Sequence, residues 1–537
     1  MPITGKILEV AQAHPERLAI VGAEARITYG ELAEDGRRVR AVVEHLRDAH
    51  PPVSVRLRSR ELPGRAESPS GLQLVDETPA AEPSERSGVD HVDARAQPVV
   101  AVSSTDAFHT ARIIAGLAGF GCVSATIDPR WPLEHQVRVV LGTGISVLVS
   151  DSDALRDALA RAGWAGAQVS LDEFRRLERK LPPAGAPSVR AGDEPFLMLF
   201  SSGTTSNPKA FLKTRAQYRA NFAVSSAYLE PLPGVATLAP GPLSYSLTLY
   251  ALVECLASGG SCHVADTFDA LAASRRIADE GVTRVVAVPA VIESLALVAR
   301  RSPERFAGVE LLVAGGANLS ARIRSAVAGA LPGARLVSYY GAAEIGFIGD
   351  SRGGDGTAIT LYDGIEAQVR GPLGDVLPDG EIGELWIRAD ACSDGYLPAT
   401  TDEQLRDTEG WATVHDQARL RGRQLELLGR AGDIVVTGGH KVSLPEVERA
   451  FELLPGADAV CAVSAPDASL GSVIALVLEG ADAPDKATVL AYARERLAPQ
   501  FVPRRVYRVG ELPRTVGGKV RRAATAELVA GGEAVRL

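Results

Sequence analysis

The stretch FSSGTTSNPK at residues 200–209 concentrates small polar side chains between an apolar run and a lysine. Gly203 permits a tight turn or a close approach to a ligand, and Lys209 adds a positive charge at the end. Hydroxyls, backbone amides and an ammonium together suit an anion with several oxygens, such as a polyphosphate. The Walker A pattern is not matched, because Lys209 follows Pro208 and precedes neither Ser nor Thr. A polar surface turn is the alternative, since the same residue types favour turns.

The surroundings of this stretch favour the phosphate interpretation. Short apolar runs separated by helical segments recur along the chain, a pattern typical of buried, mostly parallel strands. They include residues 98–104, 145–151, 195–201, 283–289 and 310–316. The pattern predicts an α/β fold in which FSSGTTSNPK leaves the carboxyl end of a strand. Open α/β sheets bind ligands at the carboxyl ends of their strands, so this position suits a phosphate-binding loop.

Length and composition limit the classes of protein to consider. The chain has 537 residues, more than one compact core usually supports, so we expect two or more domains. The 57 basic and 66 acidic residues give a net charge of −9, which argues against a general nucleic-acid binder. Five cysteines without a CxxC pattern indicate reduced thiols and no zinc site. No secretory signal is present, and the longest uncharged apolar-rich run, 113–127, is too short for a membrane span. We therefore expect a cytoplasmic protein.

The pattern changes toward the C-terminus. From residue 379 onward, β-rich segments with glycine-containing turns follow one another, and after residue 438 the order is that of a small α+β unit. We expect a domain boundary near 427–433, helices at 444–454 and 486–497, and strands at 459–463 and 473–478. Residues 51–97 are rich in Pro, Ser, Glu and Arg, which predicts an exposed and poorly ordered insertion.

Four further stretches follow the first one in an order that a known family shares. They are SYYGAAEIGFI (338–348), GWATVHDQARL (410–420), GRAGD (429–433) and PRTVGGKVRR (513–522). Together with FSSGTTSNPK, IDPRWP (127–132) and AGGAN (314–318), they resemble the motifs of the adenylate-forming (ANL, AMP-binding) superfamily, and the chain looks like an acyl-CoA synthetase-like member. One such motif is a weak signal, but five in order over essentially the whole chain outside the insertion are a strong one.

The resemblance implies a fold and a reaction. The expected fold is α/β, with a large N-terminal domain (1–431) of mostly parallel sheets flanked by helices plus a small β-barrel-like part, and a small mobile α+β domain (432–537). The expected reaction has two halves. A carboxylate first attacks the α-phosphate of ATP to give an acyl-adenylate and pyrophosphate. A thiol of coenzyme A, or of carrier-protein phosphopantetheine, then displaces AMP. ATP, Mg²⁺ and coenzyme A are the expected cofactors, with a carboxylic acid as substrate.

The resemblance also assigns roles to individual residues. The departing phosphates should contact the loop residues Ser201, Ser202, Gly203, Thr204, Thr205 and Lys209. Tyr340 should stack on adenine beside Gly316 and Gly341, because a purine face matches an aromatic face. Glu344 should hold Mg²⁺, a hard cation that prefers carboxylate oxygen. Asp416 should accept the ribose hydroxyls with help from Arg430.

Lys519 should reach the junction of carboxylate and α-phosphate and offset the negative charge that grows there. Ordinary structural roles are the alternatives for all of these residues. Tyr340 could be a core aromatic, Glu344 a solvated carboxylate, Asp416 and Arg430 an exposed ion pair, and Lys519 a surface lysine.

The chain departs from the family pattern at several positions. Ala343 stands where the motif usually has Thr, and Ser206 and Ala210 replace glycines. Gly432 aligns with the hinge residue, usually Asp or Lys, and its conformational freedom still permits rotation.

The acid pocket is expected to include Tyr245, Gly315 and Ala343. Many coenzyme A ligases carry His at the position of Tyr245, and domains for α-amino acids carry Asp there. A buried substrate ammonium would lack its charge partner, which is costly, so we expect a fatty or aromatic acid without an α-amino group.

Three other functions remain open at this point. A stand-alone enzyme could load a separate acyl carrier protein. A relative could activate an unusual acid such as nitrite and pass it to an amine, which Ala343 and Tyr245 leave open. A degenerate module could bind nucleotide without catalysis, although the retained Lys519 and Glu344 argue against it.

Overall fold

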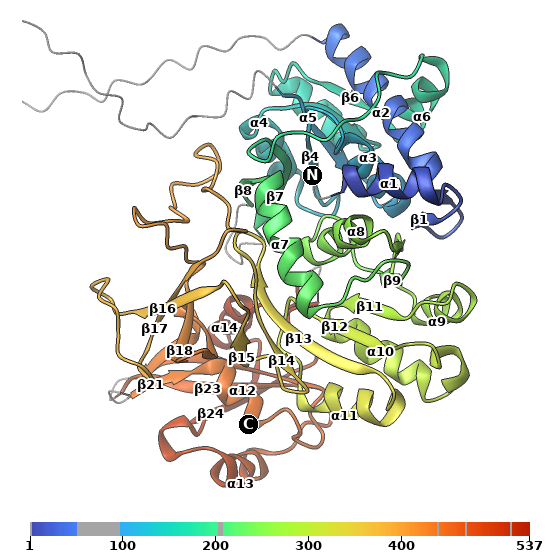
Figure 1. The fold of residues 1–537 in the computed structure, drawn as a ribbon. Helices are drawn as coiled ribbons and strands as arrows, with labels where there is room; N and C mark the ends of the chain where they lie inside the picture. The colour runs from blue at the N-terminus through green and yellow to red at the C-terminus, as the bar shows by residue number, and fades with distance from the viewer. Residues whose placement is uncertain (1–2, 51–96, 202–207, 438–439, 468–469, 516–517) are drawn as a thin grey trace, which may run out of the picture.

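The structure is a computed structural model that describes residues 3–50, 97–201, 208–437, 440–467, 470–515 and 518–537. Two predictions therefore lie outside the described residues, namely the insertion up to residue 96 and the loop positions Ser202, Gly203, Thr204 and Thr205. The described chain forms the expected α/β fold, with two large sheets, a smaller C-terminal part and helices between them (Figure 1).

The first sheet has six strands and is parallel except at its last strand, β8. Its strands, in spatial order, are β6 (Ala167–Val169), β5 (Ile145–Ser150), β3 (Val99–Ser103), β4 (Val123–Thr126), β7 (Pro195–Ser201) and β8 (Lys209–Thr214). The neighbouring helices of this part are α1 (Thr4–Ala13), α2 (Tyr29–Ala49), α3 (Ala107–Leu117), α4 (Leu133–Gly142), α5 (Asp153–Arg161) and α6 (Leu171–Lys180). Almost every strand residue is buried, which matches their continuous apolar runs.

Helices α2 and α3 cross at two glycines. A Cβ on Gly36 would stand 2.9 Å from the carbonyl oxygen of Gly116, so the absence of both side chains allows the two backbones to touch. Helix α2 begins with a capping box, in which Thr28 and Glu31 satisfy each other's backbone N–H groups. The start of this helix and its packing on α3 are therefore encoded locally.

The second sheet has thirteen strands and changes character along its length. Its parallel half contains β13 (Arg335–Ala342), β12 (Leu311–Ala314), β11 (Arg284–Ala287), β9 (Ala236–Ala239), β10 (Ser261–Val264) and β1 (Leu18–Val21), with β2 (Arg26–Thr28) antiparallel at the edge. The helices of this half are α7 (Arg215–Tyr228), α8 (Ser246–Ser258), α9 (Ala270–Asp279), α10 (Pro289–Ala299) and α11 (Ala321–Ala330).

The other half is antiparallel, and it stands where the sequence predicts a β-barrel-like part. It runs through β14 (Gly346–Arg352), β15 (Ala358–Leu361), β19 (Gln424–Arg430), β18 (Asp416–Arg421), β17 (Ile382–Arg388) and β16 (Glu366–Arg370). In Figure 1 this half lies on the left, opposite the helices of the parallel half. The two halves join at β13, which pairs with β12 on one side and β14 on the other.

The C-terminal part has its own sheets and lies at the bottom of Figure 1. It contains β20 (Ile434–Thr437), β21 (His440–Ser443), α12 (Leu444–Ala450), β22 (Ala459–Asp467), β23 (Gly471–Glu479), α13 (Lys486–Arg496), β24 (Arg505–Val509), α14 (Arg522–Gly531) and β25 (Val535–Arg536). Sheet membership changes between β19 and β20, where the sequence predicts the domain boundary.

One predicted helix is wrong at its end. The helix expected at 444–454 stops at Ala450, and residues 451–453 form a turn. Pro455 disfavours helical backbone at the preceding residue, which explains part of the difference. The turn also lets the Glu452 carboxylate accept a hydrogen bond of 2.7 Å from the backbone N–H of Ala321, at the start of α11. A contact with the large part of the molecule thus outweighs local helix propensity.

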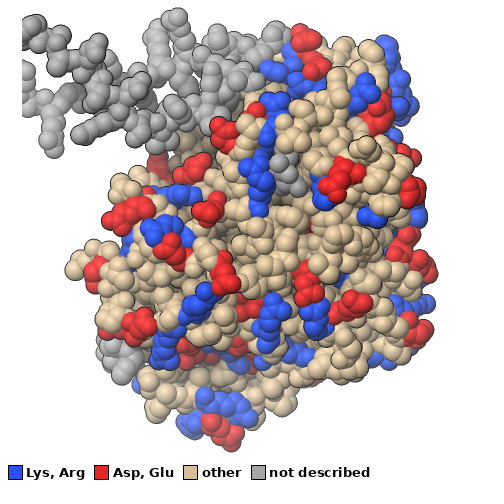
Figure 2. Space-filling model, viewed as in Figure 1, with Lys and Arg blue, Asp and Glu red and all other residues tan. Residues whose placement is uncertain are grey.

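The surface is mixed in charge. On the face shown in Figure 2, Lys and Arg are interspersed with Asp and Glu. No helix within the described residues combines the length and the apolar character that a bilayer crossing requires.

Candidate active site

The predicted site residues gather where strands of both large sheets end. Ser201 ends β7, Gly315 and Gly316 follow β12, and Tyr340 lies on β13 just before the turn that carries Glu344. Strands β12 and β13 are parallel neighbours, so their carboxyl ends meet at one edge. This edge is the place where open α/β sheets bind ligands.

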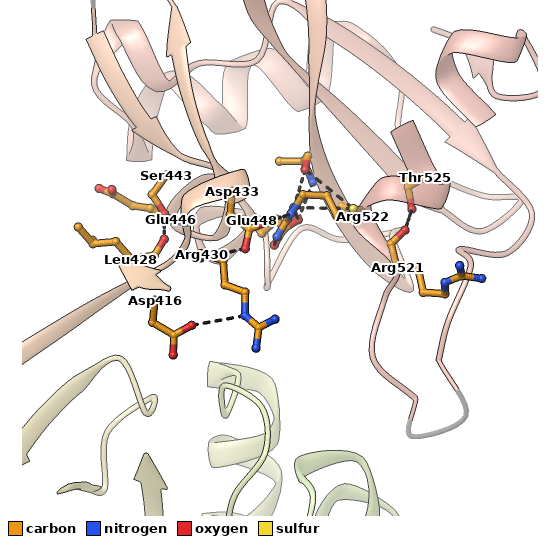
Figure 3. Close-up of polar contacts among 12 residues, drawn as sticks. Asp416, Leu428, Arg430, Asp433, Ser443, Glu446, Glu448, Arg521, Arg522 and Thr525 are labelled. Carbon is orange, nitrogen blue, oxygen red and sulfur yellow. Dashed lines mark hydrogen bonds and ion pairs between the residues drawn. The ribbon is translucent and has the colours of Figure 1, made fainter. Parts of the chain in front are cut away.

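Tyr340 and Asp416 form a short hydrogen bond within the site. The Tyr340 hydroxyl donates to Asp416 Oδ2 at 2.6 Å. Arg430 Nε lies 3.4 Å from Asp416 Oδ1 (Figure 3). Burial raises the pKa of the Asp416 carboxyl, although the Tyr340 hydrogen bond and the charges of Arg430 and Lys519 act in the opposite direction. Burial and the negative Asp416 raise the pKa of Tyr340. A partly buried carboxylate with donors from only two side chains among the described residues suits a ligand that brings hydroxyl groups of its own.

Lys519 belongs to the same cluster. Its side chain is exposed. Desolvation by nearby protein atoms and the charge of Arg430 lower the pKa of its ammonium, and the negative charge of Asp416 acts in the opposite direction. Residues expected on opposite sides of the domain boundary therefore lie within electrostatic range of one another. The ammonium is thus available next to the position expected for a nucleotide.

Glu344 is held from two sides. Its side chain is 6% exposed, and Oε1 accepts a hydrogen bond of 3.0 Å from the Tyr396 hydroxyl. Its backbone carbonyl accepts from Lys213 Nζ at 2.7 Å and from the Ser393 N–H at 2.8 Å. Burial lowers the pKa of the Lys213 ammonium to about 8. No hydrogen bond to the second carboxylate oxygen, Oε2, occurs among the described residues, so this oxygen could bind a cation.

Lys209 lies on the same side of the site. Its ammonium pairs with the Glu403 carboxylate and stands 5.3 Å from the centre of the Tyr396 ring. Ser201, at the end of β7, has a buried hydroxyl oxygen without a hydrogen-bond partner among the described residues. An unpaired hydroxyl next to an ammonium and a carboxylate fits a bound phosphate with its Mg²⁺.

Among Gly315, Gly316 and Gly341, two allow a close approach and one allows a left-handed backbone conformation. A Cβ on Gly315 would stand 2.5 Å from the Tyr339 ring, and one on Gly341 would stand 2.5 Å from the carbonyl oxygen of Gly346. Gly316 has φ +81°, in the left-handed region that favours glycine. The Ala343 carbonyl accepts a 3.0 Å hydrogen bond from the Tyr250 hydroxyl, and its side chain packs against the neighbouring hydrophobic core.

Tyr245 lies at the start of α8, with Asp128 and Arg130 beside it. Its pKa is raised by burial and by the negative Asp128, and Arg130 acts in the opposite direction. Asp128 is fully buried and accepts two hydrogen bonds of 2.8 Å from the Arg130 guanidinium. No polar contact joins Tyr245 to the Tyr340 or Glu344 clusters within the described residues.

Gly432 lies in a short 3₁₀ turn, Ala431–Asp433, that leads into the C-terminal part. Figure 3 shows Arg430 between Asp416 on one side and Asp433 on the other. Asp433 Oδ2 accepts from the Arg430 N–H at 3.1 Å, and Asp433 Oδ1 accepts from Arg522 Nε at 2.6 Å. Arg522 also donates to Glu448. Because Arg522 follows Lys519 by three residues, this network orients the segment that carries the lysine.

Several residues of the site were missed by reasoning from the sequence. They are Lys213, Tyr396, Glu403 and His415. A Gly-Tyr pair before a polar loop is the only signal that could have pointed to Tyr396, and His415 directly precedes the predicted Asp416. The described residues contain no cluster of three or more His, Cys, Asp or Glu side chains that could hold a metal ion, so a cation at Glu344 would need ligands from outside the protein. Such a site suits Mg²⁺, which keeps waters and takes substrate phosphates as further ligands.

The family model described as AMP-binding enzyme matches residues 87–397, and the model of its C-terminal domain matches residues 446–519. The chain belongs to the AMP-binding enzyme family. It is an AMP-forming acid–thiol ligase, which confirms the resemblance and the reaction class expected from the sequence. The match begins at residue 87, so the last residues of the predicted insertion align with the family.

Individual relatives are more distant. An uncharacterized acyl–CoA ligase of Bacillus subtilis, YhfT, is 25% identical over 423 residues, which cover 77% of this chain and 84% of the relative. A fatty acid–[acyl-carrier-protein] ligase of Mycobacterium marinum, MmaC, is 27% identical over 451 residues, covering 77% and 82%. The solved structure of ATP-bound MatB from Rhodopseudomonas palustris has a TM-score of 0.79 at 20% identity and 98% coverage of both chains, which confirms the fold.

The pairing of Lys209 with Glu403 gives a prediction for nucleotide binding. The Glu403 carboxylate pairs with the Lys209 ammonium, which phosphate is expected to contact. Glu403→Gln removes this competition and should tighten ATP binding. Glu403 is 47% exposed, and exposed pairs contribute little, so the expected gain is about 2- to 5-fold in Kd. Calorimetric titration with ATP checks this. Glu409→Gln, a change on the same loop near Arg388, is the control and should leave Kd unchanged. Weaker binding by Glu403→Gln would contradict the competition.

His415 gives a prediction for pH dependence. Its backbone has φ 64°, and its Nδ1 lies 2.9 Å from Glu384 Oε1 and its Nε2 3.8 Å from Glu403 Oε2. The pKa of His415 is raised, mainly by its hydrogen bond to Glu384 and also by the negative charges of Glu384 and Glu403. Partial burial and the positive charge of Lys209 act in the opposite direction. The imidazolium therefore stabilises the fold below the unfolded pKa of about 6.5, and the stabilisation is lost as pH rises through the folded pKa.

His415→Asn keeps a residue that tolerates this backbone conformation. The variant should lower the melting temperature more at about pH 5.5 than at about pH 8.5. Thermal unfolding of both proteins across this range provides the measurement. A deficit that is constant, or that grows with pH, would show that the imidazolium is not the stabilising species.

Proposed function

We propose that this enzyme activates a carboxylic acid without an α-amino group, fatty or aromatic, and transfers the acyl group to coenzyme A. A carboxylate oxygen of the acid forms a bond to the α-phosphorus of ATP, and the bond to the departing pyrophosphate breaks. The thiol sulfur then bonds to the acyl carbon, and AMP leaves. The reaction class rests on the family, and the class of acid rests on the surroundings of Tyr245.

The position of Tyr245 is the observation that favours this acid class. An α-amino acid brings an ammonium that needs a carboxylate partner when it is desolvated. The carboxylate beside Tyr245 is Asp128, whose two oxygens are already engaged by Arg130. A substrate ammonium would have to displace a bidentate guanidinium, which is a strong partner for a carboxylate. A neutral acyl chain avoids this competition.

The nucleotide would lie between the two clusters of the site. Asp416 would accept the ribose hydroxyls beside Arg430, and Tyr340 would offer its ring to adenine. Lys209 and the Ser201 hydroxyl would bind the phosphates at the other end. Glu344 would hold Mg²⁺, which supplies charge neutralisation on the phosphate oxygens when it is bound. These assignments agree with the donor and acceptor groups that the site leaves available.

Lys519 would stabilise the transition state of the first half-reaction. Its ammonium stands within electrostatic range of Asp416, at the ribose end of the site, from which the α-phosphate extends. A fixed positive charge there is worth most when water is excluded. We take residues 1–431 and 432–537 as the two domains, with Gly432 as the hinge that lets the small domain rotate between the half-reactions. The change of sheet between β19 and β20 supports this division.

Coenzyme A is the preferred acceptor, and a separate acyl carrier protein is the alternative. The relatives include a feruloyl-CoA synthase from Amycolatopsis, 26% identical, as well as the carrier-protein ligase MmaC. The five cysteines are all buried and unpaired, which fits a reducing compartment such as the cytoplasm.

An ATP–pyrophosphate exchange screen tests the proposal. Fatty and aryl acids should support exchange and α-amino acids should not, because of the occupied Asp128. Lys519→Ala should slow the exchange about 10²- to 10³-fold, the usual loss for one such charge. Lys486→Ala, a lysine of the same domain at the start of α13, is the matched control. Coenzyme A or a phosphopantetheinylated carrier is then added to identify the acceptor. Exchange with α-amino acids alone, or full exchange by Lys519→Ala, would contradict the proposal.

A further inference from the structure

A buried lysine on β8 makes contacts that the reaction scheme does not use. The Lys213 side chain is 1% exposed, and its ammonium donates to the carbonyl oxygens of Glu344 at 2.7 Å and Ala391 at 2.6 Å. Both acceptors are main-chain oxygens, and no ion pair of Lys213 occurs among the described residues. Burying an ammonium with neutral partners has a high desolvation cost in free energy. If this position only filled space in the core, an apolar side chain would be more favourable.

The two carbonyls belong to segments that carry side chains of the candidate site. Glu344 lies in the turn between β13 and β14, and Ala391 lies five residues before Tyr396. The same two segments are joined by the Ser393 N–H, which donates to the Glu344 carbonyl, and by the Tyr396 hydroxyl, which donates to Glu344 Oε1. Lys213 therefore ties the main chain on both sides of the hydrogen bond that orients the Glu344 carboxylate.

Strand β8 extends this arrangement toward the phosphate end. Residues 209, 211 and 213 share one face of the strand, because side chains alternate along it. Lys209 stands over the Tyr396 ring, and Phe211 meets the same ring edge-on, with centroids 6.2 Å apart. The Ala210 carbonyl accepts from the Leu397 N–H at 2.7 Å. One face of β8 thus aligns the phosphate lysine, Tyr396 and the Glu344 turn.

We propose that Lys213 is a positioning residue, which fixes the orientation of the Glu344 carboxylate and thereby sets the affinity of the enzyme for its divalent cation. This inference rests on the proposed role of Glu344. It differs from a purely structural role in one measurable respect. A structural ammonium contributes only to stability, whereas a positioning residue also changes how strongly Mg²⁺ promotes nucleotide binding.

The chain offers a matched control two residues away. The Arg215 side chain is fully buried and donates to the carbonyl oxygens of Ala118 at 2.7 Å and Phe120 at 2.9 Å. It also pairs with Glu194 at 3.5 Å. Arg215 is therefore another buried cation bound to two main-chain oxygens, but the segment that it holds carries none of the candidate site residues. Its removal measures the general cost of losing such a group.

The experiment compares ATP binding with Mg²⁺ and with EDTA by calorimetry, for the wild type, Lys213→Met and Arg215→Met. The Kd in EDTA divided by the Kd with Mg²⁺ measures how much Mg²⁺ strengthens ATP binding. Lys213→Met should reduce this ratio roughly 10-fold or more, the usual effect of losing a partner that orients a metal ligand. Its Kd in EDTA should stay close to the wild-type value. Arg215→Met should keep the wild-type ratio, even where thermal unfolding shows that both variants are less stable.

Each outcome decides the matter. An unchanged ratio in folded Lys213→Met, or an equal loss in Arg215→Met, overturns the proposal. If Lys213→Met shows no cooperative unfolding, Lys213→Gln, which keeps one donor group, is judged by the same ratio. A wild type whose ATP binding does not respond to Mg²⁺ would contradict the proposed role of Glu344 itself. A wild-type response that survives in the Lys213 variants contradicts only the present inference.

Discussion

The hydrogen bond between Tyr340 and Asp416 is the contact on which the arrangement of the site depends. It joins β13, where the parallel half of the large sheet ends, to β18 in the antiparallel half, 76 residues later in the chain. The partly buried Asp416 carboxylate is stabilised by donors from Tyr340 and Arg430 and by the positive charge of Lys519. The same contact therefore brings an aromatic ring, an acceptor for hydroxyls and the C-terminal lysine to one place. Without it, the two halves of the sheet would present these groups separately.

A second set of contacts, along β8, arranges the other end of the site. Lys209, Tyr396 and Glu344 come from three separate segments, and the packing of β8 against residues 391–400 brings them together. Glu344 belongs to the β8 contacts and is also close to Tyr340, because its negative charge contributes to the raised pKa of Tyr340. The two groups of residues thus lie next to each other. Their order suits the nucleotide orientation proposed above, with the ribose at Asp416 and the phosphates at Lys209.

The sequence predicted strands better than it predicted contacts. The apolar runs at 98–104, 145–151 and 283–289 correspond to β3, β5 and β11, because a buried parallel strand leaves a continuous apolar signature. The end of the helix at 444–454 was wrong, since the contact of Glu452 with α11 carries no local signal. Motif order singled out Tyr340, Glu344 and Asp416, whose proposed roles remain predictions, but nothing in the sequence marked Lys213 as buried, because lysine is almost always exposed. His415 and Tyr396 likewise gain their partners only through pairings with distant residues.

Recognition of the ribose at Asp416 is the most direct test of the account. The affinities of ATP and 2′,3′-dideoxy-ATP, measured by calorimetry for the wild type and for Asp416→Ala, form a double-mutant cycle. The account predicts that the wild type prefers ATP by at least about 10-fold, since hydrogen bonds to a charged group are strong, and that folded Asp416→Ala binds both nucleotides equally. A variant that keeps the wild-type preference would show that the ribose lies elsewhere, and the assignment of these residues to the nucleotide would be wrong.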